Sequence, residues 1–127
     1  MPVLFFERRA DVHLLSILKS KYKIPTANFI GHGDIAPTRK NDPNIYFPWA
    51  LLASKGYGLW FEPNEKLSLP TSISTSYVLA LYGYDVKDST AAILAFKRHF
   101  RQDSTLQISP ADQSVLAQML RYKLGQK

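Results

Sequence analysis

The chain of 127 residues lacks several features that define whole classes of protein. It contains no cysteine, which excludes disulfide bonds, thiol nucleophiles and cysteine-based zinc sites. No apolar run approaches the roughly 18 residues of a membrane-spanning helix, so no membrane span is expected. The start, MPVLFFERR, has an apolar patch but an early Glu7 and no small-residue cleavage site, and therefore does not fit a signal peptide.

The composition itself is that of a folded chain, with 46% hydrophobic and 13% aromatic residues. The length suits one domain or two very small ones. The formal net charge is +6, from 16 Lys and Arg against 10 Asp and Glu, and the basic residues form no tract. This charge favours an anionic partner such as nucleic acid, an acidic lipid surface or a wall polymer, or else it serves solubility alone.

Residues 1–66 have the pattern of an α/β unit. Helical spacing of apolar residues predicts an amphipathic helix over Asp11–Tyr22, which Pro25 ends. Asn28–Ile30 predicts a short buried strand that delivers His32 at its C-terminal end. Ligands collect at such strand ends in α/β folds. The apolar stripe of the predicted helix consists of Val12, Leu15, Leu18 and Tyr22.

Prolines and polar residues from Asp34 to Pro48 predict a shaped loop without regular structure. A short helix is expected to follow, with Pro48 in its first turn and Gly56 at its end. Tyr57–Glu65 is interpreted as a final strand, and Asn64–Thr71 as a linker.

Residues 71–127 predict three short helices. The first ends at Gly83, the second opens at Asp88 or Ser89, and the third opens at Ser109 with the cap-and-proline pattern of a helix start. Their apolar and aromatic side chains are expected to form a core rather than a ligand platform. They are Val78, Leu81, Tyr82, Ala92, Phe96, Phe100, Val115, Leu116, Met119 and Leu120.

The stretch GHGDIAPTRKNDP, residues 31–43, concentrates residues that can hold a metal ion. His32 and Asp42 supply an imidazole and a carboxylate, both normal zinc ligands, ten positions apart. Lys40 lies two residues before Asp42, where an ammonium could stabilise the oxyanion that forms when a metal-bound water attacks a carbonyl.

The same residues also have plain structural interpretations. One alternative is that His32 only hydrogen-bonds beside its strand, as a single histidine usually does, and that the loop is an ordinary polar surface. Asp34 could cap the loop by accepting hydrogen bonds from backbone amides or could bind a ligand, and Arg39 could contact a phosphate.

The order of residues 31–43, followed by Phe47-Pro48-Trp49, closely resembles the zinc-dependent N-acetylmuramoyl-L-alanine amidases. The most similar branch is the cell-envelope amidases that carry a small helical domain after the catalytic one. The resemblance continues through GYGLW (56–60), YGYDV (82–86) and AFKRHFR (95–101), and so spans most of the chain.

This resemblance implies a fold, a site and a reaction. Residues 1–66 would be the C-terminal part of a mixed α/β amidase domain, and residues 71–127 a three-helix peptidoglycan-binding module. His32 and Asp42 would ligate Zn²⁺, and Lys40 would polarise or stabilise the scissile amide oxygen. The reaction would hydrolyse the amide between N-acetylmuramic acid and L-Ala, with peptidoglycan or muropeptides as partners, in a bacterial cell envelope or periplasm.

The chain departs from the family pattern in one respect. In the family, a first zinc-binding histidine and a catalytic glutamate lie on earlier strands, whereas only 31 residues precede His32 here. His13 and Glu7 do not match those positions. We therefore expect the chain alone to be nearly inactive and to associate through an open sheet edge, with a missing N-terminal segment or second chain completing the site.

Two other functions compete with the enzyme. A non-catalytic or decayed peptidoglycan-binding protein would keep the helical module and retain the loop as a relic. A nucleic-acid-binding domain is suggested by the charge and by the basic residues Lys97, Arg98 and Arg101. No readout motif accompanies these cations, so nucleic acid is not the expected partner.

Overall fold

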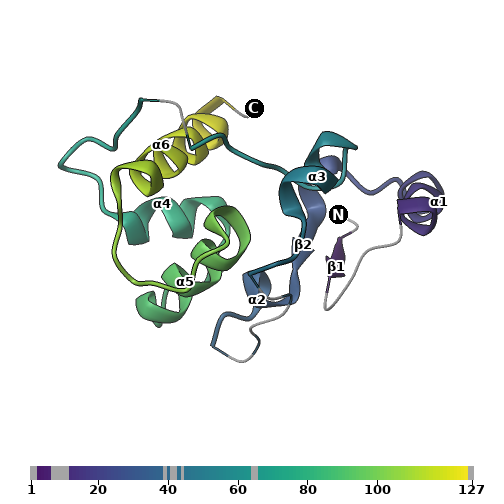
Figure 1. The fold of residues 1–127 in the computed structure, drawn as a ribbon, viewed down its shortest axis with the longest axis horizontal. Coiled ribbons are helices and arrows are strands. Elements are labelled where there is room, and N and C mark those ends of the chain that lie inside the picture. The colour runs from purple at the N-terminus through teal and green to yellow at the C-terminus, as the bar shows by residue number, and fades with distance from the viewer. Residues whose placement is uncertain are drawn as a thin grey trace.

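The computed structural model describes residues 3–6, 12–38, 40, 43, 45–63 and 66–125. Figure 1 shows the C-terminal helices grouped at one end, the strands in the middle and the first long helix at the opposite end. The elements are β1 (Leu4–Phe6), α1 (Val12–Tyr22), the 3₁₀ turn η1 (Thr26–Asn28), β2 (Phe29–Gly31), α2 (His32–Ile35), α3 (Trp49–Ser54), α4 (Thr75–Tyr82), α5 (Ser89–Phe96), the π-helical turn η2 (Lys97–Arg101) and α6 (Pro110–Gly125).

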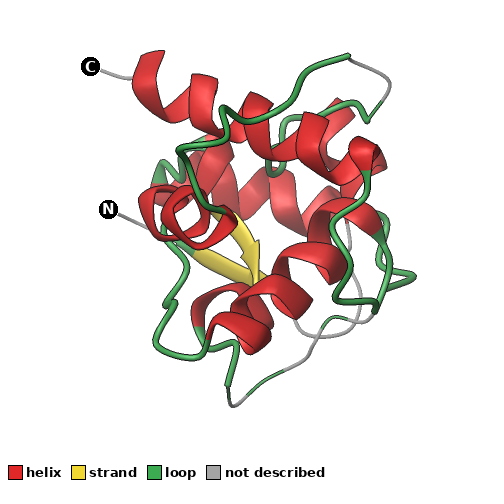
Figure 2. Ribbon diagram, turned by 90° about the vertical axis from the view of Figure 1, so that its left-hand side faces the viewer, coloured by secondary structure: helices red, strands yellow, loops and turns green. Residues whose placement is uncertain are grey.

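The strands and α1 form a small β-α-β unit. β1 and β2 pair in parallel, with Leu4 opposite Phe29, and lie side by side in Figure 2. Parallel strands cannot be joined by a tight hairpin, and α1 provides the crossover between them. The α/β prediction is supported only in this coarse sense, because the described part of the chain is mostly helical.

The prediction of a final strand over Tyr57–Glu65 is wrong for its described residues, 57–63, which form no strand. The cause lies in the backbone at Gly56 and Gly58, which have φ angles of +89° and +95°. A left-handed conformation turns the chain where a strand needs extended geometry. The segment instead runs from α3 towards the C-terminal helices.

The predicted first helix is confirmed over Val12–Tyr22, with Asp11 outside the described residues. Its predicted apolar stripe is only partly correct. Leu15 is buried, but Val12 is 38% exposed and Tyr22 is 53% exposed. α1 lies at the end of the molecule opposite the C-terminal helices (Figure 1), and Leu15 is its buried residue.

A first core cluster forms around β2 and α3. Lys19 ties α1 to this cluster, because its ammonium donates to Thr26 Oγ1 at 2.8 Å and to the Gly56 carbonyl at 2.7 Å. The buried members of the cluster are Leu15, Ile24, Phe29, Phe47, Trp49, Leu52 and Tyr57.

In the helices of residues 75–125, here called the helical segment, the end of α4 and the starts of α5 and α6 lie where the sequence predicts. Ser74 and Asp88 accept hydrogen bonds from amides in the first turns of α4 and α5, and Ser109 does so for α6. Gly83 ends α4 with a φ of +126°.

The predicted core of the helical segment is confirmed except at two positions, because Tyr82 is only partly buried against the core and Leu81 lies outside it. Leu81 is 39% exposed, and its neighbour Leu79 is fully buried in its place. The buried members are Val78, Leu79, Tyr84, Ala92, Ala95, Phe96, Phe100, Val115, Leu116, Met119 and Leu120.

The segment between α3 and α4 contacts both core clusters. Trp60 packs against both clusters. Further along, Gln118 on α6 donates to the Glu62 carbonyl at 2.6 Å, and Gln113 accepts from the Leu69 amide at 3.2 Å. No helix in the described ranges is long and apolar enough to cross a membrane.

Candidate metal half-site and its contact with the helical segment

His32 lies where β2 meets α2. The strand ends at Gly31, and His32 is the first residue of α2, with a partly exposed side chain. The placement of His32 at a strand end is therefore confirmed. The loop is less irregular than predicted, because α2 continues through Asp34 to Ile35.

The far end of the histidine loop, residues 31–43, returns to its start. Pro43 is buried, and a Cβ atom added at Gly31 would lie 2.9 Å from its Cδ atom. Such a contact is too close for any side chain, so glycine is required at position 31 if Pro43 is to pack there. Pro43 thus packs against the end of the strand that leads to His32.

The other predicted site residues are only partly described. Lys40 is exposed, its amide donates to the Ala36 carbonyl at 2.9 Å, and its own carbonyl accepts from Arg98 at 3.4 Å. Asp42 and Arg39 lie outside the described residues, so the distance between His32 and Asp42 stays a prediction.

The Asp34 carboxylate is a cap and a junction. Its Oδ2 atom accepts from the Gly31 amide at 2.8 Å and is 2.6 Å from His99 Nδ1. Its Oδ1 atom accepts from the Tyr84 hydroxyl at 2.6 Å. The capping interpretation of Asp34 is therefore confirmed, and two of its three partners come from the helical segment.

His99 is a site residue to which the sequence analysis assigned no role. It is 4% exposed, and its ring stacks on Trp49 with centroids 3.7 Å apart and on Phe100 with centroids 4.0 Å apart. Within the described part of the chain, its Nε2 atom has no hydrogen-bond partner. An unpaired buried nitrogen costs about 1–3 kcal/mol, which the short contact of Nδ1 with Asp34 offsets.

The electrostatics of the junction favour a neutral phenol. Burial, together with the negative charge of Asp34, raises the pKa of Tyr84 well above its ordinary value. Tyr84 therefore stays protonated at neutral pH and can donate its hydroxyl proton to Asp34. Burial and Asp34 raise the pKa of Tyr82 in the same way.

A pocket of about 720 Å³ opens beside this junction, between β2 and the helical segment. Asp34, Tyr84 and His99 contribute polar atoms to a lining that is otherwise largely apolar and aromatic. The remaining lining residues include Phe29, Ile30, Tyr82, Phe100 and Tyr122.

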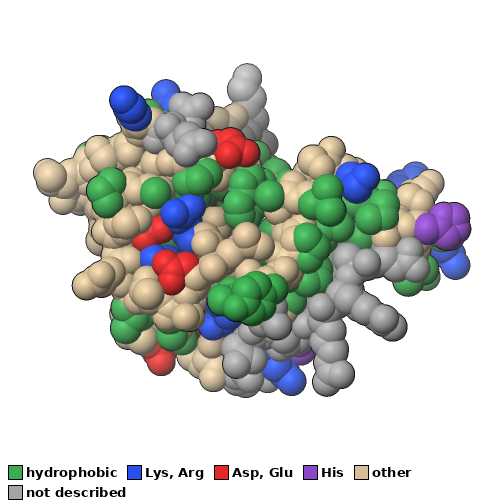
Figure 3. All heavy atoms as spheres, in the orientation of Figure 1, with side chains coloured by type: hydrophobic (Ala, Val, Ile, Leu, Met, Phe, Trp, Pro, Cys, Tyr) green, Lys and Arg blue, Asp and Glu red, His purple; other side chains and the backbone are tan. Residues whose placement is uncertain are grey.

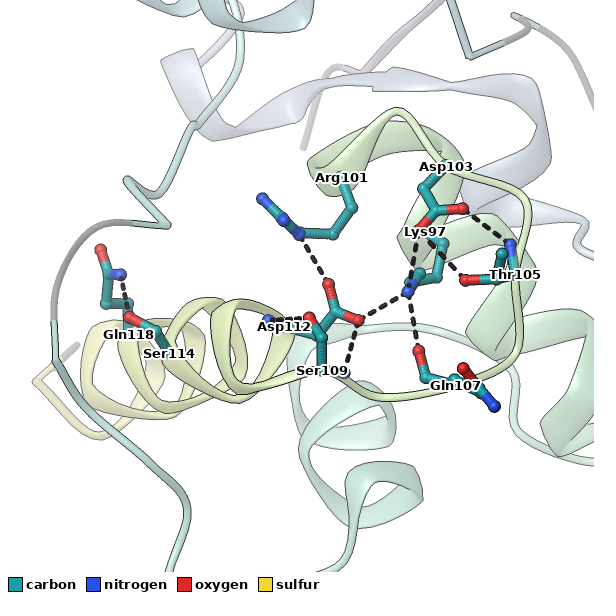
Figure 4. A network of polar contacts seen from close by, with 9 residues as sticks. All are labelled: Lys97, Arg101, Asp103, Thr105, Gln107, Ser109, Asp112, Ser114 and Gln118. Carbon is teal, nitrogen blue, oxygen red and sulfur yellow. Dashed lines mark hydrogen bonds and ion pairs between the residues drawn. The ribbon is translucent and has the colours of Figure 1, made fainter.

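The basic residues of η2 do not form a free cationic face. Lys97 is 1% exposed, and Figure 4 shows it between Asp112, Asp103 and the Gln107 carbonyl. Arg101 pairs with the other oxygen of Asp112 at 2.6 Å. On the face shown in Figure 3, the Lys and Arg side chains are scattered in small groups, and those near the centre lie beside Asp or Glu side chains. The nucleic-acid alternative therefore loses two of the three cations that suggested it.

The described residues do not by themselves make up a metal site. Among them, no group of three His, Asp or Glu side chains lies close enough to hold an ion. His32 is a chemically suitable donor, whereas both oxygens of Asp34 are already hydrogen-bonded. His13 is exposed on α1, at the opposite end of the molecule from the helical segment, and Glu7 lies outside the described residues.

The chain is similar in sequence and in fold to N-acetylmuramoyl-L-alanine amidases. The chain is homologous to the amidase AmiD of Escherichia coli strain K12, with 33% identity over 133 aligned positions, which cover 93% of this chain and 48% of AmiD. No model of a protein family matches the chain.

Solved structures agree with this relationship. The E. coli AmiD complex with the substrate anhydro-N-acetylmuramic acid-L-Ala-D-γ-Glu-L-Lys is 30% identical with a TM-score of 0.71, over 87% of this chain and 49% of that one. AmpDh3 from Pseudomonas aeruginosa, in complex with an anhydromuramic pentapeptide, is 26% identical with a TM-score of 0.66, over 84% of this chain and 50% of that one. The chain thus spans about half the length of the relatives it matches.

Proposed function

We propose that this chain carries one part of the active site of a zinc-dependent N-acetylmuramoyl-L-alanine amidase. The observation that carries the proposal is the histidine loop, which starts at the end of β2 and closes back through Pro43 onto Gly31. In a chain homologous to AmiD, this loop bears the His32, Lys40 and Asp42 pattern of the amidase family.

Each residue of the loop has a proposed role. His32 and Asp42 would hold the zinc ion, which when bound supplies an activated water and a Lewis acid for the carbonyl group. Lys40 would place its ammonium beside the scissile amide oxygen and stabilise the negative charge that develops there. Its exposed position leaves the side chain accessible to a substrate.

The proposed substrate is the amide between the lactyl group of N-acetylmuramic acid and L-Ala, in peptidoglycan or in muropeptides. This choice rests on the anhydromuramyl peptides bound to the AmiD and AmpDh3 structures. A bacterial cell envelope or periplasm is the corresponding location.

The proposed site is incomplete in this chain. A catalytic zinc site uses three protein ligands, and the histidine loop offers two. Because a missing ligand weakens metal binding strongly, we propose that a further segment or a second chain supplies the remaining histidine and the catalytic glutamate. Among the described residues only β1 and β2 pair in this sheet, so its outer edges offer a place where such a segment could pair.

The zinc part of the proposal is tested by calorimetric titration of the chain with Zn²⁺. We expect one weak site per chain, which is lost in His32→Ala and kept in Lys40→Ala, the matched control within the same loop. Unchanged binding in His32→Ala would refute the role of His32.

The catalytic part is tested by incubating the chain with purified muropeptides, with and without Zn²⁺. Little or no release of peptide from N-acetylmuramic acid is expected from the chain alone. Robust turnover by the chain alone would show that its site is complete.

The second candidate is a non-catalytic peptidoglycan-binding protein. It rests on the similarity of the chain to the muropeptide-bound AmiD and AmpDh3 structures, without requiring a metal site. Titration with Zn²⁺ distinguishes the two, because this candidate sediments with insoluble peptidoglycan but binds no zinc ion at His32.

A further inference from the structure

We infer that His99, from the helical segment, is a positioning residue for the histidine loop and acts through Asp34. The inference deepens the proposed function, since it assigns the helical segment a part in the metal half-site itself. The inference rests on the hydrogen bonds that Asp34 makes at the start of the loop, and these involve no zinc ion.

Asp34 joins the start of the loop to the helical segment. Its carboxylate receives the Gly31 amide from the end of β2, the Tyr84 hydroxyl from the segment after α4, and His99 Nδ1 from η2, at 2.8, 2.6 and 2.6 Å. Gly31 and Asp34 flank His32 in sequence. The position of the His32 backbone is therefore fixed by a carboxylate whose orientation the helical segment sets.

The His99 ring is itself held in one orientation. It is nearly coplanar with Trp49 on one face and with Phe100 on the other, at interplanar angles of 11° and 14°. A phenylalanine in this stack would fill the space without leaving a buried nitrogen unpaired. The bond from Nδ1 to Asp34 is what distinguishes histidine from phenylalanine here.

Neighbours of His99 contact the loop and the residues just after it. Arg98 donates to the Lys40 carbonyl at 3.4 Å, and Gln102 donates to the Phe47 carbonyl at 2.7 Å. The π-helical geometry of η2 widens the turn from which these side chains project, and such turns are frequent at functional sites. η2 thus contacts the loop near Asp34 and Lys40, and its C-cap residue Gln102 contacts the chain beyond the loop at Phe47.

A purely structural role must be separated from positioning. His99→Phe keeps the aromatic stack and removes the bond to Asp34. Val115→Ala is the matched control. Val115 is fully buried in the core of the helical segment, so its truncation destabilises that segment without removing a bond to Asp34. Tyr84→Phe removes the second bond to Asp34 and serves as the independent variant should His99→Phe fail to fold.

The first measurement is amide hydrogen exchange in the folded chain. The quantity measured is the exchange rate of the Gly31 amide divided by that of the α6 amides. We expect this ratio to rise at least about tenfold in His99→Phe or Tyr84→Phe compared with the unaltered chain, because local opening is set by local bonds. In Val115→Ala the two sets of amides should change together. If the ratio of the Gly31 rate to the α6 rate were the same in His99→Phe, Tyr84→Phe and Val115→Ala, the inference would be overturned.

The second measurement is the affinity for Zn²⁺. Loss of an outer partner typically weakens metal binding by about 10–100-fold, and we expect a change of about tenfold in His99→Phe with no change in Val115→Ala. Equal affinities in these two variants would overturn the positioning role. If the unaltered chain binds no zinc, the proposed function fails, while the exchange measurement still decides the role of His99.

Discussion

The Lys97 ammonium lies 2.6 Å from the Asp112 carboxylate, and both side chains are almost completely buried. Asp112 also accepts from the Ser109 amide at 2.9 Å and from Arg101 at 2.6 Å. One carboxylate therefore caps α6 and neutralises two cations of η2. Since η2 also carries His99, this ion pair supports the turn that contacts the histidine loop.

Removal of one partner of this pair should be strongly destabilising. In Lys97→Met, the Asp112 charge stays buried without its main partner, and we expect the free energy of unfolding to fall by about 3–5 kcal/mol. Urea denaturation followed by circular dichroism measures the change. Lys87→Met, at an exposed position, is the control and should change it by less than about 0.5 kcal/mol. A loss below about 1 kcal/mol in Lys97→Met would contradict this account.

The same carboxylate should make stability sensitive to acid. Burial alone would raise the pKa of Asp112, but hydrogen bonds from Lys97, the Ser109 amide and Arg101 outweigh it and lower the pKa below the ordinary value of 3.8. A lowered folded-state pKa contributes stability that is complete above the unfolded-state value and is lost as the pH falls through the folded-state value.

The test is a comparison of urea denaturation at pH 7 and near pH 3. The unaltered chain should lose stability over this interval. Asp112→Asn should be less stable at pH 7 but should lose less on acidification. Parallel losses in the two proteins would exclude Asp112 as a source of the acid sensitivity.

Gly31 should tolerate no side chain. In Gly31→Ala the new Cβ would lie 2.9 Å from Pro43 and 3.0 Å from Asp34 Oδ2, so one end of the histidine loop must move. We expect a cost of about 1–3 kcal/mol, as for overpacking, and weaker zinc binding. Gly125→Ala, where no atom lies within 4 Å of the new Cβ, is the control. A Gly31→Ala variant with unchanged stability and zinc affinity would show that Pro43 does not pack as described.

Gly58 is required for a different reason. Its φ angle is +95°, and a Cβ there would meet the Phe29 carbonyl oxygen at 3.1 Å. Gly58→Ala adds backbone strain and a contact with β2, and we expect it to cost more than about 1 kcal/mol. Gly83→Ala has a φ of +126° but no nearby atom, so it separates strain from contact. Equal melting temperatures for Gly58→Ala and the unaltered chain would contradict the argument.

The features that the sequence predicted correctly depend on local chemistry. Ser109, Asp88 and Gly83 mark helix ends because a cap needs only residues within one turn. His32 was placed correctly because a short apolar run predicts a strand and its end. Local patterns of this kind can be recognised without knowledge of the fold.

The features that the sequence did not predict depend on distant partners. His99 and Asp34 are 65 residues apart, and nothing in either segment indicates that they meet. Lys97 and Arg101 were interpreted as surface cations, because their pairing with Asp112 requires η2 and α6 to lie together. The strand predicted over residues 57–65 failed because the backbone at Gly56 and Gly58 turns away from extended geometry.

The central claim is that His32 and Asp42 hold one zinc ion between them. Titration of Zn²⁺ into the chain and into the two single variants, His32→Ala and Asp42→Ala, tests it most directly. The account predicts one site per chain that disappears in both variants and persists in Lys40→Ala. Zinc binding that survives both substitutions would contradict it.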